Sequence, residues 1–398
     1  MMNRREFLKS VALASSAPLW VRFSAIGAEA AASAGAPIPD RLLLVLYLAG
    51  GNDGLNTVVP YLDPAYAQLR PGIGLKADEV SSIGGGLALH KSLARVYSMW
   101  QQGQVAVVHN VGYSKPNFSH FDSTYIWETA SPDFQYHTGW LGRYLDATDG
   151  GSAGAVRAVA IGTGGLPRTL VGEEGAGFAL NTLSDFAFAD AGRPDAALRR
   201  AAYASFGAGV PSSAMHAKIM QAQNNMTSAV ATVSQVAKGI TGPMTPAKTV
   251  AQMFAAGVGT QIGFISVGGF DTHTTQRGAH NARLAEVDTA IAEFFDAAAA
   301  LGVADRATVV TFSDFGRRVE ENASGGTDHG SSMPVLVMGP RVIGGTYGAR
   351  PDLTALDAGN LVPAIHLGSV YSSLLAQAFD VDPAPIMGHE YPTLQLLG

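Results

Sequence analysis

The apolar residues of this chain gather in short runs, and each run is followed by a loop of glycine and polar residues. Leu, Val, Ile and Phe follow one another in these runs without polar alternation, which is typical of strands buried on both faces of a parallel sheet. The runs cover residues 41–48, 104–109, 261–267, 307–312 and 333–338. From 282 to 301 apolar residues instead recur at steps of three and four, which predicts a helix that ends at Gly302. The pattern predicts an α/β fold with helices packed on a mainly parallel sheet.

The middle of the chain, from about 150 to 259, is rich in alanine and glycine and contains no recognisable chemical motif. Two helices are predicted in it, over 195–206 and 213–238, and a closing helix is predicted over 363–379. We therefore expect one α/β domain over 41–398. It would be a three-layer sandwich with a mainly parallel central sheet and a helical insertion at about 150–259.

The N-terminus has the features of an export signal. Arg4-Arg5 precedes a mostly apolar stretch from 11 to 26, and Ala28-Glu29-Ala30 has the small residues of a cleavage site. The alternative is an amphipathic helix or membrane anchor, but a proline and an arginine interrupt the stretch, which is short for a bilayer span. We expect a twin-arginine signal peptide over 1–30 and a linker over 31–40. The protein would then be periplasmic or secreted, would use the twin-arginine export machinery, and would have no stable membrane span when mature.

Composition narrows the function classes. The 398 residues are 47% hydrophobic and 15% charged, so the chain can bury a large core and is not a disordered protein. The net charge of −6 and the lack of a basic block argue against a nucleic-acid surface. Because the chain has no cysteine, it has no disulfide, no thiolate metal site and no cysteine nucleophile.

Acidic and histidine residues follow the predicted strands at positions where a sheet would present ligands. Asp53 follows the first strand, Asp271 and His273 follow the third, and Asp314 follows the fourth. The carboxyl ends of parallel strands form one edge of a sheet, which is where open α/β proteins bind ligands. Carboxylates together with imidazoles favour Zn²⁺ or Mn²⁺ over Mg²⁺ or Ca²⁺, which prefer oxygen ligands. With His329 before the last strand, the pattern predicts a divalent metal site.

The order of these motifs resembles the alkaline phosphatase superfamily, which includes sulfatases and cofactor-independent phosphoglycerate mutases. The resemblance runs from about 41 to 379. More closely, several segments look like a secreted, sulfatase-like bacterial family of unknown function (domain of unknown function 1501), often with twin-arginine signals. Those segments are 49–61, 119–130, 138–146, 269–273 and 311–330. The resemblance implies an alkaline-phosphatase-like fold, a pair of divalent metals, and hydrolysis or transfer of phosphate or sulfate esters of small molecules or glycans.

By position, the resemblance also implies roles for single residues. One metal would lie between Asp53 and Asp314, and the other among Asp271, His273 and His329. A hydroxyl nucleophile would be activated by metal coordination, and a guanidinium would hold a non-bridging oxygen of the ester. The candidates for the nucleophile, the guanidinium and the pocket lining are, in that order, Ser119, Arg317 or Arg318, and His120 with His137.

The chain departs from the superfamily at three points. Phe315 stands where a histidine usually follows the aspartate, so the site around Asp53 and Asp314 lacks an imidazole. Asp271 and His273 are two residues apart instead of four, although an extended segment still directs both to one side. The sulfatase motif Cys-x-Pro-x-Arg is absent, which argues against a formylglycine nucleophile.

Each candidate also has a purely structural interpretation. Under it, Asp53 forms a turn, Ser119 caps a helix, and Arg317 belongs to an ion pair. The function that we expect is a metal-dependent ester hydrolase. The alternative is a catalytically silent binding or assembly protein on the same fold, which Phe315 favours. A Ser-His-Asp esterase is a weaker third hypothesis, because no Gly-x-Ser-x-Gly turn is present.

Overall fold

The computed structural model describes residues 39–148, 156–175, 177–182, 194–206 and 243–398, with the short pieces 210–213, 216–217, 220, 223–224, 233 and 236. The chain divides into two units, one of Met1–Ala34 with Thr182–Thr241 and one of Gly35–Asn181 with Gly242–Gly398. In the first unit the structure describes α7 (Ala196–Phe206), where the sequence predicted a helix. The predicted signal peptide lies outside the described residues, as does most of the helix predicted over 213–238.

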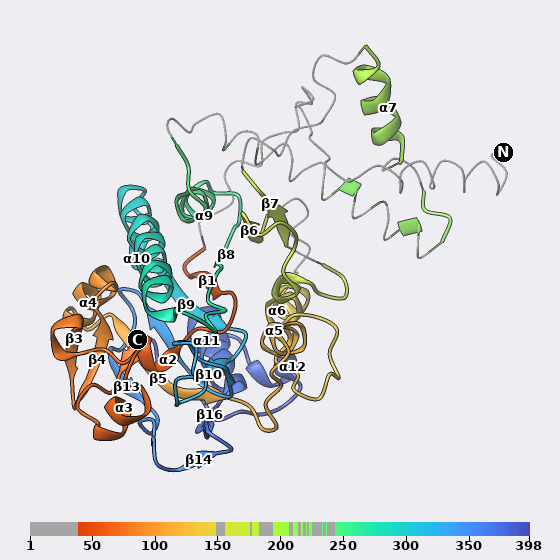
Figure 1. The fold of residues 1–398 in the computed structure, drawn as a ribbon. Coiled ribbons are helices and arrows are strands. Elements are labelled where there is room, and N and C mark those ends of the chain that lie inside the picture. The colour runs from red at the N-terminus through yellow and green to blue at the C-terminus, as the bar shows by residue number, and fades with distance from the viewer. Residues whose placement is uncertain are drawn as a thin grey trace. The chain divides into compact units, whose positions relative to one another are not determined.

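The second unit is built on one sheet that has nine strands within the described residues. Their order is β13-β5-β12-β9-β1-β8-β6-β7, and β16 pairs with β5 (Figure 1). The strands are β1 (Leu42–Leu48), β5 (Val105–Gly112), β6 (Ala158–Ile161), β7 (Phe178–Leu180), β8 (Ile262–Val267), β9 (Ala307–Ser313), β12 (Met333–Met338), β13 (Gly345–Tyr347) and β16 (Ile365–His366). β12 pairs antiparallel with β5 and β9, whereas the other pairings of this sheet are parallel. The predicted α/β fold with a mainly parallel central sheet is therefore confirmed.

β1 lies in the interior of this sheet, between β8 and β9. Leu43 is in register with Ile262 on one side and with Thr308 on the other. The side chains of β1 from Leu42 to Leu46 are buried on both faces of the sheet, which explains why the strand is an unbroken apolar run. β5 continues past its predicted end at 109 because the next residues, although polar or small, stay buried in the ladder.

Helices cover both faces of the sheet, as Figure 1 shows, and complete the predicted three layers. One layer contains α4 (Ala94–Gln101), α9 (Pro246–Ala255) and α10 (Gln276–Ala300). The other contains α5 (His120–Thr129), α6 (Trp140–Ala147), α11 (Leu367–Phe379) and α12 (Pro383–Met387). In that second layer the rings of Trp140 and Tyr371 stack with 4.3 Å between their centroids and belong to the same core cluster as alternate residues of β1.

The segment predicted as a helical insertion, about 150–259, is partly sheet. Its described residues include β6 and β7, which extend the central sheet beyond β8 through parallel pairing. These strands are only four and three residues long, so they are too short to give a clear apolar run. α9 is the described helix of the segment that packs on α10.

Smaller elements form the loops around the sheet. They are α2 (Gly54–Thr57), α3 (Pro64–Leu69), β2 (Val58–Val59), β3 (Val80–Gly84), β4 (Leu87–His90), β10 (Gly316–Arg317), β11 (His329–Gly330), β14 (Leu356–Asp357), β15 (Asn360–Leu361) and the 3₁₀ turns η1 (Ala77–Glu79), η2 (Arg168–Leu170) and η4 (Ala304–Arg306). Among the described residues, no helix combines the length and the apolar character that crossing a bilayer requires.

Five loops meet at one edge of the sheet. The loops after β1, β5, β8 and β9 leave the carboxyl ends of these strands. The loop before β12 reaches the same edge because β12 runs antiparallel to β5 and β9. The topology therefore brings together polar residues that are far apart in the sequence, and the candidate site lies at this edge.

The packing of the second helical layer can be tested at Glu128, whose carboxyl lies on α5. Burial raises the pKa of its carboxyl to about 7, although hydrogen bonds from η2 oppose the shift. The folded protein therefore holds a proton that the unfolded chain releases near pH 4.3, and stability contributed by this group falls as pH rises from about 4 to about 7. Glu128→Gln should raise the free energy of unfolding at pH 8 by about 1 to 3 kcal/mol and change it little at pH 4.5.

Urea unfolding at these two pH values measures the effect. Glu286→Gln, which changes a half-exposed carboxylate on α10, is the control and should show no such pH dependence. An equal effect of Glu128→Gln at both pH values would contradict the burial of the charge.

Candidate metal centre

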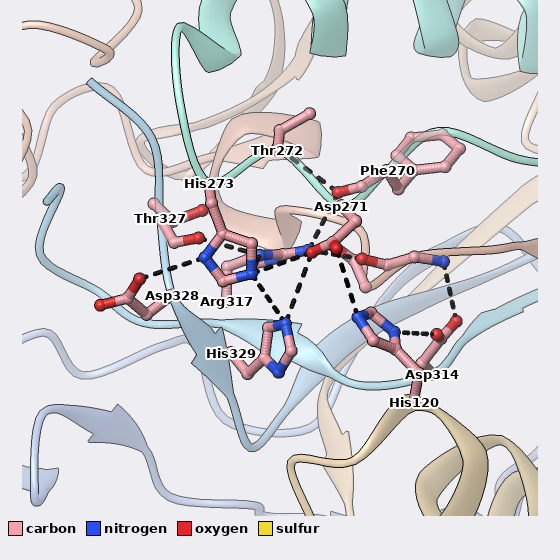
Figure 2. A network of polar contacts seen from close by, with 12 residues as sticks. His120, Phe270, Asp271, Thr272, His273, Asp314, Arg317, Thr327, Asp328 and His329 are labelled. Carbon is pink, nitrogen blue, oxygen red and sulfur yellow. Dashed lines mark hydrogen bonds and ion pairs between the residues drawn. The ribbon is translucent and has the colours of Figure 1, made fainter. Parts of the chain in front are cut away.

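Three histidines and one aspartate face one another at the sheet edge, as Figure 2 shows. His120 is the first residue of α5, which follows β5. Asp271 and His273 lie in the loop after β8, and His329 lies in β11, before β12. The structure thus brings together the predicted set of Asp271, His273 and His329, and adds His120 to it.

Each of the three imidazoles has its Nδ1 atom hydrogen-bonded to an oxygen that has no proton to give. The contacts are His120 to Asp314 Oδ2 at 2.6 Å, His273 to Asp328 Oδ1 at 3.2 Å, and His329 to the Phe118 carbonyl at 2.7 Å. Carboxylate and carbonyl oxygens accept, so every Nδ1 carries the proton. In the neutral rings, every Nε2 therefore presents a bare lone pair.

The three Nε2 atoms converge on the Asp271 carboxylate. The distances to its oxygens are 2.9 Å from His273, 3.4 Å from His329 and 3.5 Å from His120. The Nε2 atoms of His273 and His329 are 2.9 Å apart, although neither neutral ring has a proton to share there. Burial lowers the pKa of His329, which favours its neutral form. Arg317 approaches His273 Nε2 at 3.4 Å and Asp271 at 2.8 Å, but it makes no contact with the Nε2 atoms of His120 and His329 in the described residues. The lone pairs of these two rings face the carboxylate and repel it unless a further cation lies among them.

This donor set fits a divalent cation. Ligand atoms of His120, Asp271 and His329 all lie within 4.8 Å of one another, and His273 Nε2 adds a fourth. Imidazole nitrogens with a carboxylate oxygen suit Zn²⁺ or a similar transition metal, and histidine ligands held through Nδ1 by carboxylates or carbonyls are usual at such sites. The residues present therefore suit a metal that prefers nitrogen to an all-oxygen shell.

Arg317 was predicted to hold the substrate, but the structure gives it another role. Its side chain is 0% exposed. Its guanidinium donates to Asp271 Oδ1 at 2.8 Å and to four backbone carbonyls, those of Gly50, Gly51, Phe270 and Thr327. Its Nη1 atom also lies 3.4 Å from His273 Nε2. No donor is left over for an ester oxygen, so Arg317 is a positioning residue. Its neighbour Arg318 is exposed at the surface.

Arg317 also fixes the charge of Asp271. Partial burial would raise the pKa of this carboxyl, but the hydrogen bond and the positive charge of Arg317 hold it below its usual value. Asp271 is therefore ionised at neutral pH and half exposed, as an anionic ligand must be.

Asp314 was predicted as a metal ligand, but its carboxylate is buried and fully engaged. Oδ2 accepts from His120, and Oδ1 accepts from the Tyr47 hydroxyl at 2.7 Å and the Gly50 backbone N–H at 3.0 Å. Burial and the charge of Asp314 raise the pKa of Tyr47, so the phenol stays protonated and donates. Through these contacts Asp314 orients the proposed ligand His120, and its own oxygens are already engaged.

Asp53 was predicted to share a metal with Asp314, and the structure does not bring the two together. Asp53 is completely buried and accepts from Arg70 at 2.5 Å and from Gln276. It also caps α2 through the backbone N–H groups of Leu55 and Asn56. Burial would raise its pKa, but Arg70 keeps the pKa lowered. The turn-former interpretation of Asp53 therefore agrees with its geometry.

Phe315 packs against two of the proposed ligands, His120 and His329. Its ring centroid lies 4.2 Å from that of His329 and 4.8 Å from that of His120. Gly51 makes room for the ring, because a Cβ at this position, where φ is +78°, would collide with it. The two aspartates predicted for a second metal are engaged by other partners, and among the described residues one group of candidate ligands is found.

Ser119 is the N-cap of α5, as the structural interpretation expected. Its hydroxyl accepts a long hydrogen bond of 3.4 Å from the Asp122 backbone N–H and is partly exposed. Sequence reasoning placed His120 in the pocket but missed it as a ligand, and missed Asp328 as the partner of His273. The sequence did contain a signal for both, because His120 directly follows the candidate Ser119 and Asp328 directly precedes the candidate His329.

Comparison with protein families gives one match: residues 40–367 match the family described as "Protein of unknown function (DUF1501)". No curated protein matches the chain.

Several solved structures are similar over most of the chain. One is murine ectonucleotide pyrophosphatase / phosphodiesterase 5 in complex with AMP, with 9% identity and a TM-score of 0.38 over 88% of this chain and 96% of that chain. Another is the C-terminal periplasmic domain of EcEptC from Escherichia coli, with 10% identity and a TM-score of 0.37 over 85% and 82%. A third is the PsFucS1 sulfatase from Pseudoalteromonas sp., with 12% identity and a TM-score of 0.34 over 88% and 68%. At these values the likenesses carry no argument about activity or residue roles.

Replacing the buried guanidinium should destabilise the whole sheet edge. Arg317→Lys retains the charge but cannot reach all five acceptors with a single ammonium group, so buried carbonyls lose their partners. We expect the free energy of unfolding to fall by about 3 to 5 kcal/mol, measured by urea denaturation. Arg318→Lys, at the exposed neighbour, is the matched control and should leave stability unchanged. Similar stability of both variants would contradict the role assigned to Arg317.

Asp314→Asn tests the support of His120. The amide cannot accept from both His120 and Tyr47 as the carboxylate does, so the ring loses its fixed orientation. Affinity for Zn²⁺, measured by competition with a chelating dye, should fall about 10- to 100-fold. Asp296→Asn, at an exposed carboxylate paired with Arg95, should keep the affinity of the unmodified protein. Unaltered affinity in a folded Asp314→Asn protein would rule out this supporting role.

Proposed function

This chain belongs to the DUF1501 family of proteins of unknown function, and we propose that it is a metal-dependent hydrolase of phosphate or sulfate esters. The ligands in this proposal are His120, Asp271, His273 and His329. The observation that carries it is the convergence of three Nε2 lone pairs on one carboxylate at 2.9 to 3.5 Å, with every Nδ1 proton already engaged. The ester class is suggested by the resemblance of the sequence motifs to those of sulfatases and phosphatases.

The bound cation would supply Lewis-acid polarisation of an ester oxygen and charge neutralisation in the transition state. Residues of the chain preorganise the binding site of this cation. Asp271 provides the anionic ligand, and Arg317 keeps this carboxylate ionised. Asp314, Asp328 and the Phe118 carbonyl fix the three imidazole orientations, so no ring has to turn during turnover. The centre is partly exposed, which leaves an ester access to it.

Ser119 is the proposed nucleophile. It lies between Phe118, whose carbonyl holds His329, and the ligand His120. Its hydroxyl is engaged by one long contact and is accessible. The start of α5 also directs backbone N–H groups toward this side, which favours an anionic group nearby. Attack by the hydroxyl would form an ester on Ser119 and release the alcohol, and water would then cleave that ester.

We infer an exported protein, periplasmic or secreted, from the twin-arginine motif at its N-terminus. Its partners would be the twin-arginine export machinery and a small-molecule or glycan ester. The cation would be Zn²⁺ or Mn²⁺ in preference to Mg²⁺ or Ca²⁺, because three of its four ligands are nitrogens.

The test combines metal content with turnover. Protein purified without a histidine tag should contain a near-stoichiometric transition metal by elemental analysis, and should hydrolyse aryl phosphate or aryl sulfate in a chelator-sensitive manner. His329→Ala should lose most of the metal and lower kcat/KM at least about 100-fold, since a ligand is removed. His389→Ala, at an exposed histidine that contacts the Tyr391 ring, is the matched control and should keep both.

The outcomes separate the hypotheses. Metal without turnover of any phosphate or sulfate ester would indicate the catalytically silent binding protein, and neither metal nor turnover would contradict the proposed centre. Ser119→Ala should keep the metal and abolish turnover. If Ser119→Ala turns over normally, water is the nucleophile and the assignment of Ser119 is wrong.

A further inference from the structure

Exposed phenylalanines concentrate beside the metal centre. In the part of the chain that the structure describes, the exposed phenylalanines are Phe118, Phe121 and Phe134, at 39%, 89% and 43% exposure. Scattered apolar residues on a surface need no explanation, but a group of aromatic rings next to a polar site does. The Phe118 carbonyl accepts from His329, and Phe121 directly follows His120 in the sequence.

The geometry of α5 arranges these rings in a row. Phe121 and Tyr125 are one turn apart and share a face of the helix. His120 and Thr124 share the neighbouring face, which points to the sheet, because Thr124 Oγ1 lies 2.9 Å from the Tyr47 hydroxyl. The Phe134 ring packs against Tyr125 with 5.5 Å between centroids. Phe121, Tyr125 and Phe134 therefore form an aromatic strip that starts at the residue next to a metal ligand.

The far end of the aromatic strip is rigid and polar. The Tyr125 hydroxyl donates to the Tyr136 carbonyl at 2.7 Å and lies 2.8 Å from His137 Nδ1. The Arg168 guanidinium lies 4.8 Å from the centre of the Tyr125 ring and donates to the His137 carbonyl at 2.6 Å. Arg168 and Phe134 pack on the Tyr125 ring, so the rings of the strip that a ligand can cover are those of the exposed Phe121 and Phe134. Hydroxyl or anionic groups of a ligand would meet Arg168 at this end.

We propose that the aromatic strip is a substrate subsite, and that the alcohol part of the ester carries a ring that stacks on it. This inference rests on the proposed function, which places the phosphate or sulfate group at the metal centre. The shared chemistry is a ring with an apolar face, either an aromatic ring or a sugar ring. A simple alkyl ester would leave the strip uncovered and would bind less well. Each stacked ring should contribute about 3- to 10-fold in affinity.

Non-hydrolysable anions test the subsite without turnover. Titration calorimetry on the metal-loaded protein compares phenylphosphonate with methylphosphonate, and benzenesulfonate with methanesulfonate. The ring-bearing member of at least one pair should bind about 10-fold more tightly. Phe121→Ala and Phe134→Ala should each reduce this preference while leaving metal content and affinity for the methyl compound unchanged. Leu301→Ala, an exposed apolar residue after α10, is the control and should leave the preference as it is.

The outcomes distinguish this inference from the proposed function. Equal binding of ring and methyl compounds, or a preference that survives Phe121→Ala and Phe134→Ala together, would overturn the subsite and leave the hydrolase proposal standing. Binding of no anion at all would contradict both. A phosphonate analogue of glucose 6-phosphate then separates the two ring types, because tighter binding than phenylphosphonate assigns a sugar, and weaker binding assigns an aromatic ring.

Discussion

A single buried guanidinium holds the loops of the sheet edge together. Arg317 lies in β10, shortly after β9, and donates to the loop after β1, the loop after β8 and the loop before β12. Its charge is matched by Asp271, which is the acidic group that it contacts among the described residues. If one loop moved away, a buried N–H group of the guanidinium would lose its acceptor, which is costly. The hydrogen bonds of Arg317 therefore fix the positions of these loops. The ligand geometry is therefore determined by the same interaction that stabilises the edge.

Hydrogen bonding then decides which atoms of the site are available. The acceptors on Nδ1 come from three different loops, and together they leave the three Nε2 atoms facing Asp271. The Phe315 ring packs against the imidazoles of both His120 and His329, which also contact each other with 4.6 Å between centroids. This packing requires glycine at position 51, because a Cβ there would collide with the Phe315 ring. Hydrogen bonds thus orient the imidazole rings, and packing against Phe315 limits the positions of two of them.

The strands of the central sheet could be predicted from the sequence, because burial of a strand on both faces leaves a local run of apolar residues. Strands covered on both faces appear as unbroken apolar runs, and the positions of Asp271, His273 and His329 after or before such runs place them at one edge. The same reasoning failed for Asp53 and Asp314. Whether a carboxylate binds a metal depends on what else reaches it, and Arg70 and Tyr47 approach from positions that no local pattern relates to them. β6 and β7 were missed because such short strands derive their stability from their neighbours.

The interior position of β1 has a consequence for biosynthesis. Its two neighbours, β8 and β9, begin only at Ile262 and Ala307, so β1, the first strand that the structure describes, has no ladder partner until synthesis has passed residue 262. At roughly 5 to 20 residues per second, translation takes on the order of ten to fifty seconds to supply both. During that interval an apolar, uncharged strand with free backbone groups is prone to pair with other chains. The nascent polypeptide therefore needs shielding of β1, by the ribosome exit region or a chaperone, until the sheet can close around it.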